Sequence, residues 1–204
     1  MITIIDYGLG NILAFVNVYN RQNIPVRVAK TPAELEGASR LILPGVGSFD
    51  HAMVQLNQSG MRGPIEHMVL EQKVPVLGIC VGMQMLADGS DEGSEAGLGW
   101  VPGRVRKFDG SKLPKGTLLP HMGWNDVVPA GAGGLFRELE HDSRFYFLHS
   151  YYFECAQPAD ALAHTEYGPA FSCAVRKDNV YGVQFHPEKS HHFGARLLSN
   201  FAEV

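Results

Sequence analysis

The first ninety residues alternate between two hydrophobic patterns. Short runs of apolar residues, bounded by Gly, Pro or Asp, predict strands. Between them, apolar residues recur at helical spacing, as with Ile12, Phe15, Val16 and Tyr19. Strands that alternate with helices predict an α/β fold in which a parallel sheet carries helices on both faces. The predicted strands lie at 2–5, 25–29, 40–45 and 74–79, and the predicted helices at 11–22, 50–58, 64–72 and from about 81.

The second half of the chain has a different pattern, with many strand-like segments separated by short turns. We expect antiparallel strands that extend the parallel sheet. A closing helix is predicted over 192–204, because Phe193, Leu197, Leu198 and Phe201 form one apolar stripe. No internal repeat or linker interrupts the chain, so residues 1–204 are predicted to form one domain. The strand-like segments lie at 100–108, 124–128, 144–154, 161–168, 171–177 and 180–185.

Composition excludes several classes of protein. The net charge is −4 and no run of Lys or Arg occurs, so neither a nucleic-acid nor an anionic-membrane partner is expected. No apolar run has membrane-spanning length, and the start MITIIDYG has no basic region typical of a signal peptide. The three cysteines are an odd, sparse set, which predicts reduced thiols and a cytoplasmic protein. Of these, Cys155 and Cys173 have no motif around them and are interpreted as structural.

Two patterns that could hold a cofactor or a metal are incomplete. The glycines of DYGLGN (6–11) lack the spacing of a dinucleotide-binding loop, and the following strand ends in Lys30 rather than an acidic residue. The pair His191 and His192 opens a helix without acidic neighbours, which makes a poor metal site. We therefore expect neither a cofactor nor a metal ion.

The segment Gly78-Ile79-Cys80-Val81-Gly82 frames a thiol with two glycines, directly after a buried strand. This is the pattern of a nucleophile elbow, where a strained turn exposes the nucleophile and glycine avoids a collision on either side. The N-terminus of a following helix would favour a thiolate. The Val81 N–H would lie beside a developing oxyanion. The alternative is an ordinary core cysteine at the end of a strand.

The segment FHPE (185–188) supplies a base for such a thiol. Pro187 biases His186 towards an extended backbone, and residues i and i+2 of an extended chain point to the same side. Glu188 would then accept the imidazole N–H and leave the other ring nitrogen available to Cys80. Alone the segment could be a simple turn, but together with the Cys80 elbow it predicts a nucleophile, a base and a residue that orients the base.

These segments, LGICVGMQ (77–84) and GVQFHPEKS (182–190), resemble the class I, triad-type glutamine amidotransferases. Four more stretches narrow the resemblance to glutaminase subunits of imidazole glycerol phosphate synthases: DYGLGN, LPGVGSF (43–49), PHMGWN (120–125) and FLHSYY (147–152). The resemblance spans the chain from Ile5 to the final helix. It implies a flavodoxin-like three-layer sandwich with a mostly parallel central sheet, and hydrolysis of L-glutamine to glutamate and ammonia through a Cys thioester.

The resemblance also assigns roles to single residues. Cys80, His186 and Glu188 are implied as catalytic. Val81, together with Val46 and Gly47 of PGVG, is implied to hold the oxyanion, although PGVG could be an ordinary turn. The substrate-binding residues implied are Gly47, Gln84, Glu92 and the backbone of Ser150 and Tyr151. For Glu92 a solvated acidic loop, DEGSE, is an equal alternative.

Members of this family pass ammonia to a second protein. The resemblance implies a heterodimer with a (β/α)8-barrel cyclase or synthase subunit, which makes imidazole glycerol phosphate and AICAR in histidine biosynthesis. The docking face would include Asn11, Met122, Trp124 and Lys189, with His121 nearby, since exposed aromatic and Met residues suit the centre of an interface. Trp124 in the core is the alternative.

One stretch departs from the family pattern: ILAF follows GN, where a small polar residue is usual, and lies on the implied docking face. A paralogue that supplies ammonia to a different synthase, for example for amidation of a surface sugar, is therefore a second hypothesis. Two others are a non-catalytic regulatory subunit and a cysteine hydrolase of the same fold that acts on peptides or small acyl compounds.

Overall fold

The computed structural model describes residues 1–204, and its first half follows the predicted alternation of strands and helices. Each predicted strand and helix is present within a few residues of its expected bounds. In chain order the elements are β1 (Ile2–Ile5), α1 (Ile12–Arg21), β2 (Val26–Ala29), η1 (Pro32–Leu35), β3 (Arg40–Gly45), α2 (Phe49–Gln58), α3 (Arg62–Glu66), the π-helical turn η2 (His67–Glu71), β4 (Val76–Cys80) and α4 (Val81–Gln84).

The second half is mostly strands and turns, as predicted, and closes with a helix that covers the parallel strands. Its elements are β5 (Gly89–Ser90), β6 (Gly103–Lys107), η3 (Gly110–Lys112), β7 (His121–Asp126), β8 (Val128–Pro129), η4 (Gly134–Phe136), β9 (Arg144–His149), β10 (Tyr151–Cys155), η5 (Pro158–Asp160), β11 (Ala161–Glu166), β12 (Ala170–Lys177), β13 (Val180–Val183), η6 (Pro187–Lys189) and α5 (His191–Phe201).

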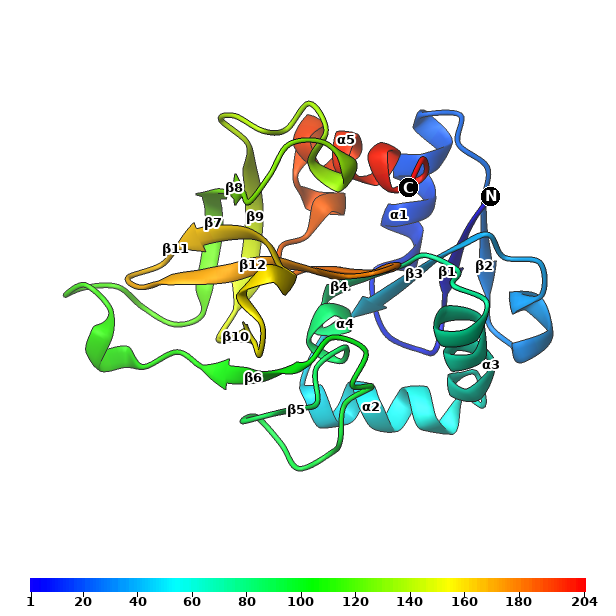
Figure 1. Ribbon diagram of the computed structural model, residues 1–204, viewed down its shortest axis with the longest axis horizontal. Coiled ribbons are helices and arrows are strands. Elements are labelled where there is room, and N and C mark those ends of the chain that lie inside the picture. The colour runs from blue at the N-terminus through cyan, green and yellow to red at the C-terminus, as the bar shows by residue number, and fades with distance from the viewer.

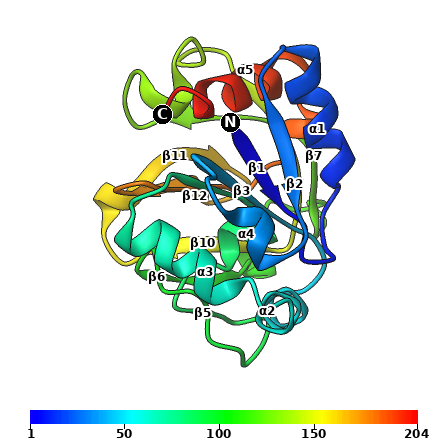
Figure 2. The same cartoon turned by 90° about the vertical axis from the view of Figure 1, so that its right-hand side faces the viewer.

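The central sheet has the order β2-β1-β3-β4-β13-β12-β10-β6-β5; β11 pairs with β12 off this path, and β8 pairs with β11. Strands β2, β1, β3, β4 and β13 run parallel, and β13, β12, β10 and β6 alternate in direction. Helices α1 and α5 cover one face of the parallel strands, and α2 and α3 cover the other (Figures 1 and 2). The predicted α/β fold, a mostly parallel sheet extended by antiparallel strands, is confirmed.

Strands β7 and β9 differ from the prediction, because they form a separate two-stranded sheet instead of extending the main one. The segment 144–154 is divided at Ser150: β9 pairs with β7, whereas β10 joins the central sheet. Side chains of β9 alternate, so that Phe145, Phe147 and His149 are buried and the residues between them face outward. This antiparallel pair, called the β7–β9 ribbon below, lies away from the parallel strands (Figure 1).

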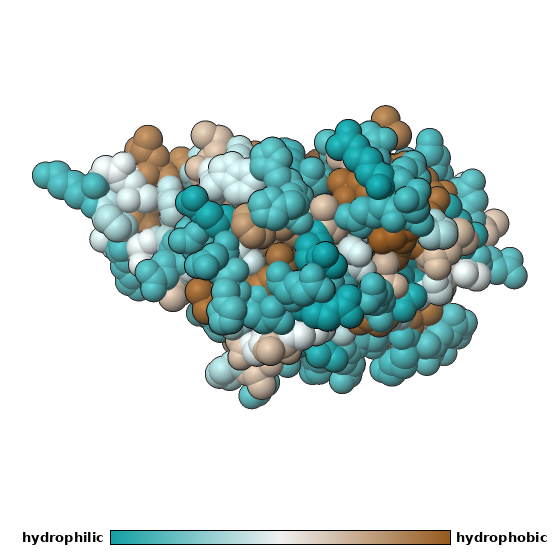
Figure 3. Space-filling view, turned by 90° about the horizontal axis from the view of Figure 1, so that it is seen from above, coloured by the Kyte–Doolittle hydropathy of each residue, from teal (hydrophilic) through white to brown (hydrophobic).

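Two of the predicted helices are short or irregular in the structure. The helix after Cys80 comprises only Val81–Gln84, all buried, and the segment 64–72 is divided into α3 and the π-helical turn. The buried hydrophobic side chains of both halves form one continuous cluster. Seen from above, the surface is mostly hydrophilic, with small hydrophobic patches scattered between polar side chains (Figure 3). None of the helices combines the length and apolar character needed to span a bilayer.

Candidate active site

Cys80 lies at the carboxyl end of the central strand β4, immediately before α4. Its backbone has φ 56° and ψ −114°, a conformation that a residue with a side chain rarely adopts. Strain of this kind costs on the order of 1–3 kcal/mol and persists only where the surrounding structure enforces it. The expected strained elbow is therefore present. Because α4 has only four residues, little helix dipole acts on the sulfur.

Three glycines allow close packing around the elbow, two of them between α4 and β3 and one between β4 and α4. Gly45 lies opposite Cys80 in the sheet register, and a Cβ there would overlap the backbone of Val81 and Gly82. A Cβ on Gly82 would overlap the carbonyl of Leu43. At Gly78, a Cβ would lie 2.6 Å from the Gly82 oxygen. The glycines on both sides of Cys80 thus serve the close approach that the sequence pattern indicates, and Gly45 is a further requirement.

His186 and Glu188 form a buried pair. The His186 Nδ1–H donates to Oε1 of Glu188 at 2.9 Å, and the two side chains are 7% and 3% exposed. The reason differs in part from the extended geometry expected from the sequence. His186 is extended, but Pro187 begins the 3₁₀ turn η6, which contains Glu188. The turn, rather than a two-residue strand repeat, brings the carboxylate under the ring.

The structure brings His186 and Cys80 together. Burial alone would lower the pKa of His186, but hydrogen bonds with Cys80 and Glu188, together with their charges, raise it from 6.5 to about 10. The imidazole of His186 is therefore held as the imidazolium across the neutral range. A nucleophile, a base and a carboxylate that orients the base lie in one row, from β4 to η6.

The turn that carries His186 is anchored to the β7–β9 ribbon. The His186 N–H donates to the Tyr146 carbonyl at 2.9 Å, and the Tyr146 N–H donates to Ser190 Oγ at 3.0 Å. Ser190 Oγ in turn donates to the His186 carbonyl at 2.6 Å. These three bonds close a small ring, so the position of His186 depends directly on strand β9.

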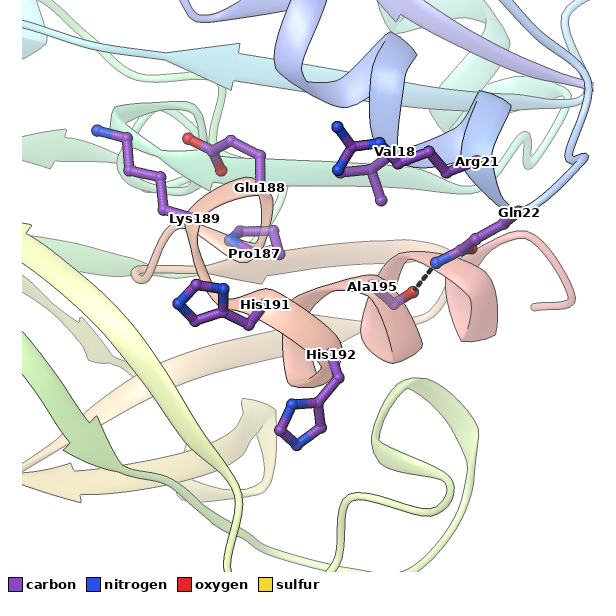
Figure 4. A pocket seen from close by; sticks show the side chains of 9 residues that line it. All are labelled: Val18, Arg21, Gln22, Pro187, Glu188, Lys189, His191, His192 and Ala195. Carbon is purple, nitrogen blue, oxygen red and sulfur yellow. Dashed lines mark hydrogen bonds between the residues drawn. The ribbon is translucent and has the colours of Figure 1, made fainter.

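A hollow with a volume of about 370 Å³ lies behind Glu188. Figure 4 shows it between Arg21 of α1, the turn with Glu188 and Lys189, and the first residues of α5; the Gln22 side chain donates to the Ala195 carbonyl at 2.8 Å. Oε2 of Glu188 is buried and has no hydrogen-bond partner. Only one oxygen of this carboxylate is therefore engaged, and it is the one that holds the imidazole.

Cys80 opens into a cavity of about 320 Å³, which matches the size of a small amino-acid ligand. Gly47 has a positive φ of 86°, which glycine adopts readily, and Val46 beside it is 39% exposed. The Tyr7 hydroxyl donates to the Pro44 carbonyl at 2.7 Å and fixes the strand before this loop. The cavity is lined by Val46, Gly47, Cys80, Val81, Gln84, Glu92, Pro120, Leu148, His149, Ser150 and Tyr151, and so contains every residue for which an oxyanion or substrate role is implied.

Two glutamine side chains fix the floor of the cavity. Nε2 of Gln84 donates to Oε1 of Gln184 at 3.0 Å and to the Tyr151 carbonyl at 3.3 Å. Nε2 of Gln184 lies 3.9 Å from Sγ of Cys80 and donates to it. Sequence reasoning missed Gln184, although it stands two residues before His186 in GVQFHPE, where an extended chain places side chains on the same side.

Glu92 has a structural partner as well as a place in the cavity wall. Its Oε2 accepts the backbone N–H of Phe49 at 2.9 Å, at the first residue of helix α2. An acidic side chain at this position stabilises the free N–H groups and the dipole of the helix. The solvated acidic loop considered for DEGSE does not describe Glu92, because its carboxylate is tied to α2.

The residues implied for partner docking are exposed. Met122 is 65% and Trp124 40% exposed, both on the outer face of the β7–β9 ribbon. Trp124 stacks on His191, with ring centroids 5.2 Å apart, so the alternative of a core tryptophan is wrong. Nζ of Lys189 lies over the ring of Tyr146, 5.9 Å from its centroid. Asn11 is exposed directly before α1.

His121 adjoins this outer face, because it directly precedes Met122 in β7, but its side chain is not part of the face. It is 2% exposed and points inward from β7, because residues alternate between the two faces of the strand. The two other cysteines are also sequestered: burial raises the pKa of Cys155 to about 11 and raises that of Cys173 further. Nowhere do three or more His, Cys, Asp or Glu side chains converge in a way that could hold a metal ion.

The geometry is that of a cysteine nucleophile with a paired histidine and carboxylate, and comparison with known proteins places the chain in a family. Residues 3–204 match the family model described as glutamine amidotransferase class-I. The chain therefore belongs to the class-I glutamine amidotransferases.

Within this family, the chain is similar to subunits of one synthase. It is 64% identical over 204 residues, the full length of both chains, to the imidazole glycerol phosphate synthase subunit HisH of Bdellovibrio bacteriovorus. It is 48% identical, again over the full length of both, to the protein of the same name from Leptospira borgpetersenii. A crystal structure of a glutamine amidotransferase superposes on the chain with a TM-score of 0.76 at 19% identity. The match covers 100% of this chain and 99% of the other, which shows that the two share a fold.

Proposed function

We propose that this chain is the glutaminase subunit of an imidazole glycerol phosphate synthase, acting in histidine biosynthesis. The observation that carries the proposal is that Cys80, in the wall of a cavity of about 320 Å³, lies beside the buried pair His186 and Glu188. The 64% identity to a HisH subunit over the whole chain supports the choice among amidotransferases.

The reaction follows from the arrangement of these groups. The Cys80 thiolate attacks the side-chain amide carbon of L-glutamine, and the oxyanion that forms is stabilised by the Val81 N–H and the peptide at Val46 and Gly47. His186 donates its proton to the departing nitrogen, and ammonia leaves. His186 then takes a proton from water, whose oxygen attacks the thioester carbon, and glutamate is released as the thiolate reforms. Glu188 holds the imidazole in the required tautomer throughout.

The cavity also offers groups that would bind the substrate. Gln84 is held by Gln184 and Tyr151, so its position at the floor is fixed before glutamine enters. The backbone of Ser150 and Tyr151 forms one wall, and the carboxylate of Glu92 would meet the α-amino group of glutamine. A neutral, uncharged floor with one acidic side chain suits a zwitterionic amino acid with an amide end.

Ammonia released into water is protonated and lost as a nucleophile, so a glutaminase of this kind needs a partner. We infer a heterodimer with a (β/α)8-barrel synthase subunit that uses ammonia to make imidazole glycerol phosphate and AICAR. The partner would dock on the exposed Met122 and Trp124 of the β7–β9 ribbon, with Asn11 and Lys189 at its margin. Exposed Trp and Met at the centre of a polar rim are typical of such interfaces.

Complementation with an activity assay tests the proposal. The chain is expressed with the synthase subunit of its own genome in a strain that lacks the glutaminase subunit, and growth without histidine is scored. Glutamate release from glutamine is measured on the purified pair, with Cys80→Ala as the inactive control. Growth that depends on Cys80 supports the proposal. Glutaminase activity without growth would favour a paralogue that serves another synthase, and release from other amides or esters but not glutamine would favour a different hydrolase.

A further inference from the structure

Two buried histidines lie beside the cavity and have no part in the reaction above. His121, the first residue of β7, and His149, the last of β9, are cross-strand partners in the ribbon and are 2% and 6% exposed. Nδ1 of His121 lies 2.9 Å from Nε2 of His149, and Nδ1 of His149 lies 2.7 Å from the Tyr151 carbonyl oxygen. His149 lines the cavity.

The hydrogen bonds of this pair allow only one arrangement of protons. The Tyr151 carbonyl can only accept, so Nδ1 of His149 carries the hydrogen and its Nε2 is an acceptor. Nδ1 of His121 must then donate to that acceptor. Nε2 of His121 accepts in turn from the Asn125 side-chain amide at 3.3 Å. The result is a directed chain from Asn125 through both rings to Tyr151.

Both rings are held neutral. Burial lowers the pKa of His121 to about 4. For His149, burial lowers the pKa to about 3; the hydrogen bond to Tyr151 opposes this, and the charges of His121 and His186 add to it. A proton added to either ring would place two N–H groups face to face, because His121 and His149 each use one nitrogen as an acceptor. The pair is therefore a fixed structural unit at neutral pH, not a proton carrier.

This chain of hydrogen bonds ends at the point where the polypeptide crosses from the ribbon to the central sheet. At Ser150 the polypeptide leaves the β7–β9 ribbon and enters β10 of the central sheet. The Ser150 carbonyl accepts the Phe108 N–H at 3.2 Å, and the Tyr151 carbonyl accepts from His149 and from Gln84. The bond from His149 is the shorter of the two on Tyr151, at 2.7 Å against 3.3 Å. The orientation of this stretch of backbone in the cavity wall therefore depends on the imidazole of His149.

Packing alone does not require imidazoles here. The ring of His121 stacks between Phe147 and Tyr167, at centroid distances of 4.7 and 4.0 Å, and His149 contacts Phe108 and Phe147. Phenylalanine would fill such an aromatic cluster without the desolvation cost of buried ring nitrogens. A specific hydrogen-bonding role accounts for the polar atoms.

We propose that His121 and His149 are positioning residues for the glutamine site, which fix the Ser150–Tyr151 backbone against the ribbon that carries the docking face. The inference rests on the proposed function, because it takes this backbone as part of the glutamine-binding wall. The outer side of the same two strands carries Met122 and Leu148, which are paired across the ribbon. A partner that moves the ribbon would thus move the cavity wall through the histidine pair.

Binding of L-glutamine to the full chain with Cys80→Ala, which removes turnover, tests the role of the pair. Calorimetric titration compares this parent with His149→Phe and His149→Asn, and then with His121→Phe and His121→Asn. Phenylalanine keeps the ring volume and removes the donor. The asparagine amide can place a donor where Nδ1 lies but leaves a void among the aromatic rings. Thermal unfolding of each variant is measured in parallel.

If the donors matter, the dissociation constant for glutamine rises about fivefold in both phenylalanine variants, the effect of losing roughly one hydrogen bond. It stays within about twofold of the parent in both asparagine variants, although these lose more thermal stability because of the void. The inference is overturned if the phenylalanine variants bind as the parent does, or if affinity follows thermal stability across the four. A parent that binds no glutamine would overturn the proposed function as well, which separates the two failures.

Discussion

Glu188→Gln tests whether the charge of Glu188, and not only its shape, sets the state of His186. Glutamine has the same volume and can still accept the His186 N–H with its side-chain oxygen. Only the negative charge is removed from the 2.9 Å contact. Because the carboxylate is 3% exposed, water does little to screen this charge.

The size of the effect follows from the contact. Unit charges 2.9 Å apart attract by about 6 kcal/mol at an effective dielectric constant of about 20. Removing both groups from water offsets most of that, so a net loss of about 2 kcal/mol is expected. This corresponds to a fall of roughly 1.5 units in the pKa of His186, from its raised value of about 10. The contribution of Cys80 remains, so the pKa does not return to 6.5.

The protonation of His186 is measured directly by NMR of the imidazole nitrogens across a pH titration, with His186→Asn to assign the signals. Glutamate release by the complex is expected to fall about 30-fold in kcat for Glu188→Gln, with KM changed less than about threefold, since the 2 kcal/mol acts on proton transfer. Equal pKa values of His186 in the parent and the variant, or unchanged kcat, would refute the reasoning.

Three further predictions concern the elbow, the buried histidines and the docking face. Gly45→Ala should lower the free energy of unfolding, measured by urea titration, by about 3 kcal/mol, because the added Cβ overlaps the Val81 backbone. The control Gly63→Ala, whose Cβ meets no neighbour, should change it by less than about 0.5 kcal/mol. The free energy of unfolding should fall as the pH is lowered from 6.5 to about 4, because His121 and His149 stay neutral in the folded protein while the unfolded chain takes up protons. In urea titrations at several pH values, His149→Phe should show a shallower fall of this free energy with pH. An unchanged dependence on pH would contradict the prediction. Trp124→Ala should weaken binding of the synthase partner by about 2 kcal/mol, measured by calorimetry, and leave thermal stability nearly unchanged, since Trp124 is 40% exposed.

Stability should also decline on the alkaline side, but here the cause is a histidine pKa that is raised in the folded protein instead of lowered. The pKa of His186 is raised in the folded protein, so the stability it provides is complete below about pH 6.5 and is lost as the pH rises towards 10. Urea titrations between pH 6.5 and 10 should show this decline, and Glu188→Gln should make it shallower. A decline of the same slope in the variant would show that another group is responsible.

The parallel half of the fold and the catalytic row could be predicted because their signals are local. A buried strand shows itself as an apolar run, and the elbow requires glycine on both sides of Cys80 within five residues. The link between His186 and Glu188 is also local, although its geometry is that of a 3₁₀ turn rather than an extended pair. Hydrophobic patterning and steric need were sufficient for these features.

The features that were missed depend on contacts between distant segments. Whether β9 pairs with β7 or with the central sheet is decided by tertiary packing, since both partners suit its alternating pattern. The helix-capping bond from Glu92 to Phe49 spans 43 residues, and the bond from Gln184 to Cys80 spans 104. The bond between Glu92 and Phe49 has no short-range signal, whereas Gln184 had one, because it stands two residues before His186 in an extended stretch.

Only one of the three thiols, that of Cys80, lines the active-site cavity. Cys173 is fully enclosed and Cys155 half-buried, and both have raised pKa values, so neither is a ready nucleophile at neutral pH. A small alkylating reagent at neutral pH should therefore react once per chain, at the sulfur that faces the cavity. Reagent consumed per chain would then report the fraction of correctly formed sites in a preparation, and protection by glutamine would report how many of them are occupied.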